Sequence, residues 1–162
     1  LPLSTKGNKF TYTFWIFIRN IPENANILNS SFVNDKFVFS RNNSPGVYYN
    51  IKKNILKINM NYKDSSSKIN TQTFKINITK LKIQKWSHIA LVLNNREFHV
   101  YINGNLYKTS IIPSVPFIYN KNLLIGEKNN NFNGYLFDGR YYNTTLDRSK
   151  IYKIFNESKN MI

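Results

Sequence analysis

Apolar and polar residues alternate along most of the first 110 positions of the chain. In residues 10–21, FTYTFWIFIRNI, both sets of alternate positions are apolar, with Phe14 on one face and Trp15 on the other. A period of two is that of a β-strand, and apolar residues on both faces indicate a strand inside a sheet that is covered on both sides. The strand should end before Pro22, which has no main-chain N–H to donate.

Shorter alternating stretches follow, separated by turn-forming residues. KFVFSR ends at NNSPG, whose proline and glycine favour a turn. VYYNI and ILKINMNY alternate again on either side of KKN, which predicts a hairpin. After the polar loop KDSSSK, the stretch TFKINIT predicts a further strand. We therefore expect strands at 36–41, 47–51, 55–62 and 73–79.

Residues 85–107 hold the clearest local signal. WSHIALVL is expected to turn at Asn94 and Asn95, return as EFHVYI, turn again at Asn103 and Gly104, and leave as NLYKTS. Asn-Gly between alternating apolar residues predicts a type I′ hairpin, because both central residues of that turn need a positive φ. The pattern predicts consecutive antiparallel strands here.

A helical period appears only near the end, in residues 146–158, LDRSKIYKIFNES. Its apolar residues at helical intervals are Leu146, Ile151, Ile154 and Phe155. Asp147 or Ser149 can cap the start of this helix. Many short strands and one helix predict an all-β chain, a two-sheet antiparallel jelly-roll sandwich with one short C-terminal helix. The length fits a single domain, residues 1–162.

The charge of the chain points to acidic partners. Twenty-three Lys and Arg against eight Asp and Glu give a net charge of +15, which attracts anionic groups and surfaces. The basic residues are spread singly or in pairs and form no basic tail or recognition helix, so nucleic acid is disfavoured as a partner. The chain has no cysteine, and no apolar run approaches the roughly 20 residues of a membrane span.

Several short motifs occur in a characteristic order. They are W-x-H-I-A (86–90), V-Y-I-N-G (100–104), L-I-G (124–126), F-x-G-x-L (132–136) and R-Y-Y-N-x-x-L (140–146). Together with the first long strand they resemble the laminin G-like (LamG) branch of the concanavalin A-like lectin/glucanase superfamily. The resemblance covers nearly the whole chain and implies a concanavalin A-like sandwich. The start at Leu1, without methionine, is consistent with a fragment of a longer protein.

A closer similarity rests on four stretches taken together. SPGVYY, the WSHIALVLNNR hairpin, LYKTSIIPSVP and FNGYLFDGRYYN make the chain similar in pattern to LamG-type modules encoded by large DNA viruses. This implies a non-catalytic binding or assembly module, a minor capsid or fibre-type component that docks on capsid or surface proteins with acidic patches. Its expected location is the virion, or else the extracellular space or cell surface. The alternative is a lectin-like carbohydrate-binding module, which includes binding of anionic glycans.

Acidic residues and histidines do not form a catalytic pattern. Glucanases of this fold need two carboxylates close together, whereas the acidic residues here are isolated along the chain. We therefore expect no enzymatic activity and no cofactor. His88 occupies the histidine position beside Trp86 in the LamG pattern, where a packing role is expected, and His99 is expected to be an exposed or half-buried strand residue.

Asp138 is the candidate ligand for a calcium ion. Asp138 matches an acidic position of the LamG pattern, but its neighbours Phe137 and Gly139 offer no second carboxylate. Calcium needs several oxygen ligands, so a metal site is disfavoured. The favoured interpretation is structural, with Asp138 either pairing with Arg140 or accepting hydrogen bonds from loop amides.

Sugar binding needs aromatic faces and planar hydrogen-bonding groups. The candidate ligand-binding residues are Tyr48, Tyr49, Asn50, Asn61 and Tyr62. The favoured alternative is that these tyrosines form the core and rim of a sandwich. Structural roles are expected for Trp15, Trp86, His88, Asn103, Gly104, Gly126, Gly134 and Arg140.

Overall fold

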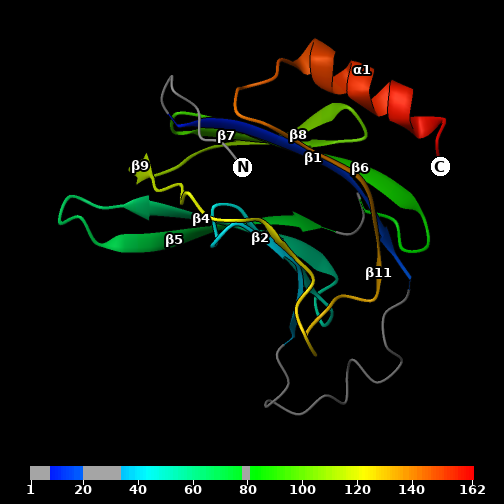
Figure 1. Cartoon of the computed structure of the whole chain (residues 1–162), viewed down its shortest axis with the longest axis horizontal. Helices are drawn as coiled ribbons and strands as arrows, with labels where there is room; N and C mark the ends of the chain where they lie inside the picture. The colour runs from blue at the N-terminus through cyan, green and yellow to red at the C-terminus, as the bar shows by residue number, and fades with distance from the viewer. Residues whose placement is uncertain (1–7, 20–33, 78–80) are drawn as a thin grey trace.

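Two antiparallel sheets stack face to face, and a helix covers the outer face of one of them (Figure 1). The computed structural model describes residues 8–19, 34–77 and 81–162. The elements are β1 (Lys9–Ile18), β2 (Asp35–Ser40), β3 (Gly46–Asn50), β4 (Ile55–Lys63), β5 (Ile69–Asn77), β6 (Trp86–Asn94), β7 (Glu97–Ile102), β8 (Asn105–Ile111), β9 (Val115–Pro116), β10 (Leu124–Ile125), β11 (Gly134–Tyr142) and α1 (Arg148–Lys159). The first sheet has the order β11-β1-β6-β7-β8 and the second β10-β2-β3-β4-β5, with β9 paired to β4.

This architecture confirms the predicted all-β sandwich with one C-terminal helix. β1 lies between β11 and β6 and is buried along nearly its whole length, as its two apolar faces predicted. The hairpin of β3 and β4 is also confirmed. β5 begins at Ile69, four positions before the expected start. Pro22 lies outside the described residues.

The main core fills the space between the sheets. Phe14 and Ile16 of β1 pack there with Leu56 and Ile58 of β4, because every second residue of each strand faces inward. A second, smaller apolar cluster lies on the outer face of the first sheet, where Ile151 and other residues of α1 cover β6. The first sheet is therefore covered on both faces.

The predicted type I′ turn joins β7 and β8. Asn103 and Gly104 have φ values of 49° and 76°, as that turn requires. The Asn103 side chain accepts from the His88 main-chain N–H at 2.9 Å, and the Asn103 N–H donates to the His88 carbonyl at 2.8 Å. The other predicted turn is shifted by one position, since β6 continues through Asn94 and the turn residues are Asn95 and Arg96.

The C-terminal helix begins where the sequence indicated. Asp147 is the N-cap of α1, and its carboxylate accepts from the Lys150 N–H at 2.9 Å. The segment before it is held against β1, because the Thr11 hydroxyl donates to the Thr144 carbonyl and accepts from the Leu146 N–H. These contacts fix α1 to the first sheet.

Replacing Gly134 with alanine is expected to lower the free energy of unfolding by about 2 kcal/mol, because overpacking forces the backbone to shift. A Cβ at Gly134 would collide with the carbonyl oxygen of Phe17 on the paired strand and with the Phe132 ring. Urea unfolding measures the loss. Gly139→Ala in the same strand is the control, since a Cβ there meets no atom within 4 Å. Equal stability of the two variants would contradict this close approach.

Candidate functional site

The sandwich is open along one side, where the edge strands β10 and β11 belong to different sheets. A pocket of about 780 Å³ lies at this edge. Phe39 and Ile125 line it from the second sheet together with Leu123, which precedes β10. Phe14 and Leu136 line it from the first sheet. A predominantly apolar concave site of this size is typical of a binding site.

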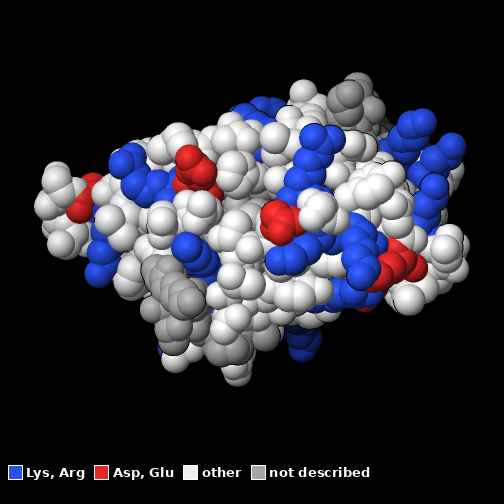
Figure 2. Space-filling view, turned by 90° about the horizontal axis from the view of Figure 1, so that it is seen from above, with Lys and Arg blue, Asp and Glu red and all other residues white. Residues whose placement is uncertain are grey.

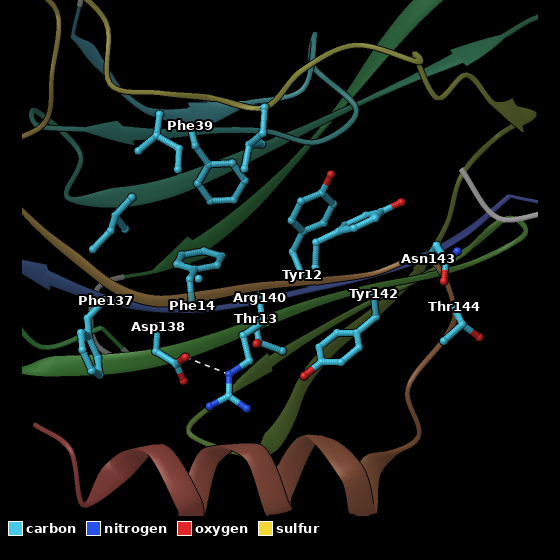
Figure 3. A pocket seen from close by; sticks show the side chains of 15 residues that line it. Tyr12, Thr13, Phe14, Phe39, Phe137, Asp138, Arg140, Tyr142, Asn143 and Thr144 are labelled. Carbon is cyan, nitrogen blue, oxygen red and sulfur yellow. Dashed lines mark hydrogen bonds and ion pairs between the residues drawn. The ribbon is translucent and has the colours of Figure 1, made fainter. Parts of the chain in front are cut away.

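The residues around this pocket form two groups. Figure 3 shows Tyr12, Phe14 and Phe39 between the sheets, and Asp138 and Arg140 on the other side of β1 and β11, toward α1. The space between the sheets is therefore lined by aromatic and aliphatic side chains. The charged residues lie on the opposite side of the edge strand and do not enter it.

Both edge strands carry exposed apolar residues. Leu124 and Ile125 of β10 are 63% and 67% exposed, and Tyr135 and Phe137 of β11 are 51% and 36% exposed. Ile125 and Phe137 also line the pocket, whereas Leu124 lines a separate hollow, and Figure 3 shows Phe137 on the α1 side of β11. We call Leu124, Ile125, Tyr135 and Phe137 the apolar rim.

A phenol and an arginine border the space between the sheets. Arg41 is fully buried, its Nε donates to the Lys121 carbonyl at 3.0 Å, and its guanidinium lies 5.6 Å from the centroid of the Tyr141 ring. Burial raises the pKa of Tyr12 to about 12, although Arg41 acts in the opposite direction. Tyr12 is therefore neutral at physiological pH.

A polar group lies under α1. Asp138 has φ 48° at a bulge in β11 and accepts from Arg140 Nε at 2.8 Å, which is one of the two structural roles expected from the sequence. This hydrogen bond raises the pKa of Arg140. His88 is buried between the rings of Trp15 and Phe155, and its burial lowers its pKa to about 4. His88 is therefore neutral at pH 7.

The candidate ligand-binding residues do not gather on one surface. Tyr49 and Tyr62 face the core between the sheets. Tyr48, Asn50 and Asn61 lie on the other face of the second sheet, because neighbouring residues of a strand point to opposite sides. Asn50 and Asn61 are buried there, and Asn61 donates to the Asn42 carbonyl at 3.2 Å. A ligand-binding role for these residues stays a prediction.

Tyr48 lies in a second, smaller hollow of about 440 Å³ on the outer face of the second sheet. Its hydroxyl donates to Asn43 Oδ1 at 2.7 Å, and its ring stands edge-on to that of Phe37. Asn122 and Lys121 also line the hollow. Sequence reasoning found Tyr48 but not Lys121 or Asn122, which lie far along the chain.

The expected structural residues lie as follows. Trp15 is buried under α1, and its Nε1 donates to Ser158 Oγ at 2.9 Å. Trp86 is half-buried beside Phe17. Gly126 has φ 76° just after β10.

Within the described residues, no three histidine or acidic side chains gather to hold a metal ion, and no helix is long and apolar enough to cross a membrane.

The two stacked sheets with an unclosed edge define a concanavalin A-like β-sandwich. The chain belongs to the Concanavalin A-like lectin/glucanases superfamily, since its laminin G family model matches residues 2–152. A comparison with curated proteins gave no match.

Solved structures share this fold. The chain is similar to the binding domain of Paraclostridial Mosquitocidal Protein 1, with 21% identity and a TM-score of 0.67 over 94% of this chain and 38% of that chain. It is similar to the binding domain of botulinum neurotoxin DC in complex with rat synaptotagmin II, with 20% identity, a TM-score of 0.63, and 92% and 35% covered. It is also similar to the receptor binding domain of botulinum neurotoxin D, with 16% identity and a TM-score of 0.64 over 98% of this chain and 39% of that chain. The chain thus spans less than two fifths of each of these structures.

Proposed function

We propose that the chain is a non-catalytic binding and assembly module that docks on other proteins. The observation that carries this proposal is the apolar pocket at the unclosed edge, whose two edge strands carry the exposed residues of the apolar rim. Similar solved structures support it, because they are binding domains, one of them in complex with rat synaptotagmin II.

The acidic residues support a role without catalysis. Asp35 binds Lys57, Asp138 binds Arg140, and Asp147 caps α1. Asp64 accepts from the Ser66 and Lys68 main-chain N–H groups of its own loop. A glycosidase needs two carboxylates poised on either side of a substrate bond, whereas each of these carboxylates is engaged locally.

The proposal includes a place in a virion, as a minor capsid or fibre-type component, or else at the cell surface or in the extracellular space. The similarity of SPGVYY and FNGYLFDGRYYN to modules of large DNA viruses supports it. Figure 2 shows basic side chains spread singly and in small groups over the face that carries α1, with acidic ones between them. Such a surface favours acidic protein partners over nucleic acid.

A lectin-like role is the second candidate, favoured by one row of side chains. Phe37, Tyr48, Lys57 and Lys75 lie opposite one another on four neighbouring strands of the second sheet. Phe37 is buried and Lys57 is bound to Asp35, so the Tyr48 ring and the Lys75 cation are the groups of this row that suit an anionic sugar. The row adjoins the hollow lined by Tyr48 and Lys121.

One experiment separates these functions. The purified chain is used to select from a displayed library of random peptides, and is applied in parallel to an array of neutral and sulfated oligosaccharides at low and high salt. A docking module is expected to enrich related peptides that bind saturably. Saturable binding of one saccharide, lost in Tyr48→Ala, would instead make the lectin role primary. Hydrolysis of a glucan, or no ligand of either kind, would overturn the proposal.

A further inference from the structure

We propose that the edge between β10 and β11 binds an extended acidic segment of a partner protein that carries one large apolar side chain. The apolar side chain enters the pocket between the sheets, and the acidic residues on either side of it are attracted by the positive charge of the segments that bear the edge. This inference rests on the proposed docking function and names its surface and the chemistry of its partner.

The lining of the pocket determines which side chain of the partner can enter it, here called the anchor. Its walls between the sheets are Phe14, Phe39, Leu123, Ile125 and Leu136, so an aromatic or large aliphatic side chain exchanges water for apolar contacts. Ile125 lines the pocket and is also 67% exposed, which places it at the mouth. An anchor in a fully desolvated pocket typically carries much of the affinity of an interface.

The charge around the edge determines which residues of the partner segment are favoured on either side of the anchor. The segments on either side of β10 hold Lys121 and Lys128, each within four positions of Ile125. Beside β11, the guanidinium of Arg19 lies 5.8 Å from the centroid of the Tyr135 ring. The acidic residues there are Glu127 and Asp138, and Asp138 is already bound to Arg140. The edge therefore keeps an excess of positive charge.

The net charge also decides against a second copy as the occupant. Each chain carries +15, so two copies would repel each other at short range. An acidic segment is attracted by the same field, which raises its association rate more than that of a neutral one.

The backbone of the edge suits an extended segment. Within the described part of the chain, β11 pairs with β1 alone and β10 with β2 alone, so each strand has one free edge. The bulge at Asp138 interrupts the ladder of β11, which limits strand addition to the stretch before it. A segment of a few residues fits these limits, and a long added strand does not.

The test uses a fluorescein-labelled peptide of alternating aspartate and glutamate with one central tryptophan. Fluorescence anisotropy compares it with the same peptide carrying serine at the centre. The tryptophan peptide is expected to bind at least tenfold more tightly, and its affinity is expected to fall as salt rises, because acidic residues contribute. Equal affinities of the two peptides would mean that the tryptophan contributes nothing and that charge alone drives binding, which would overturn the proposal.

Protein variants locate the site. Ile125→Asp places a carboxylate at the pocket mouth and is expected to weaken binding at least tenfold, and the double variant Lys121→Glu with Lys128→Glu tests the charge without altering the pocket walls. The matched control is Ile111→Asp, an exposed aliphatic residue on β8 at the opposite edge of the first sheet, which is expected to change affinity less than twofold. Each variant is checked for an unchanged urea unfolding midpoint.

The outcomes distinguish this inference from the proposed function. If peptides selected from the random library bind the wild type, Ile125→Asp and the double lysine variant alike, the docking function stands and the edge is excluded. If neither the library nor the array yields a ligand, the docking function itself fails.

Discussion

Replacing Trp15 with alanine is expected to lower the free energy of unfolding by about 3–5 kcal/mol, the range for removing a large buried aromatic side chain. Trp15 is 2% exposed and lies under α1, with its ring centroid 5.6 Å from that of Phe155 and 5.2 Å from that of His88. The substitution leaves a cavity and also removes the donor to Ser158 Oγ, which is fully buried. Urea unfolding followed by far-ultraviolet circular dichroism measures the loss.

The matched control is Tyr152→Ala on the same helix. Tyr152 is half exposed, so its truncation is expected to cost much less than that of Trp15. A cost for Trp15→Ala below about 1 kcal/mol would mean that α1 does not pack on β1 in solution, since removal of a buried aromatic ring costs more.

Lowering the pH from 7 to 4 is expected to remove about 3 kcal/mol of stability through His88 alone. Burial lowers the pKa of His88 from 6.5 to about 4; nearby Asp138 opposes this shift and Arg140 adds to it. Between pH 6.5 and 4, His88 is mostly protonated in the unfolded chain but mostly neutral in the folded chain. The contribution is therefore complete above about pH 6.5 and is lost as the pH falls toward 4.

The measurement is the free energy of unfolding in urea at several pH values between 7 and 4. Carboxylates also titrate in this range, so the contribution of His88 is the difference between the wild type and His88→Gln. His99→Gln is the control, because His99 is a half-buried residue of β7 beside Thr109. If His88→Gln loses stability with falling pH as steeply as the wild type, His88 is not kept neutral by burial.

Local signals predicted the elements that local chemistry determines. Asn103 and Gly104 specify their turn, because its positive φ values suit asparagine and glycine. Asp147 marks the start of α1 as a capping residue. The two apolar faces of β1 placed it inside a sheet. Each of these signals lies within a few consecutive residues.

Other features depend on residues that are distant in the sequence. The stretch GYLFDGRYY matched a family motif, but its bulge at Asp138 breaks the period of two, so alternation alone did not mark it as a strand. The first part of β5 was missed because INTQT is mostly polar and is held by pairing with β4.

The pocket could not be predicted from pattern either. Phe39, Leu123 and Leu136 meet only because the sheet order brings β10 and β11 to the same side. By contrast, the separation of Tyr48 from Tyr49 follows from the period of a strand, since adjacent residues cannot share a face. Because neighbouring residues of a strand point to opposite sides, Tyr48 and Tyr49 cannot belong to one binding surface.

The place of β1 in its sheet has a consequence for biosynthesis. β1 is made first, yet its neighbours are β6 and β11, and β11 ends at Tyr142. During translation β1 can pair with β6 only once Asn94 has emerged, and its other edge waits for β11. Pairing over such separations is slow. An apolar segment of high β-propensity that waits this long is prone to aggregate, so chaperone supply during synthesis, more than final stability, should limit the yield of folded protein.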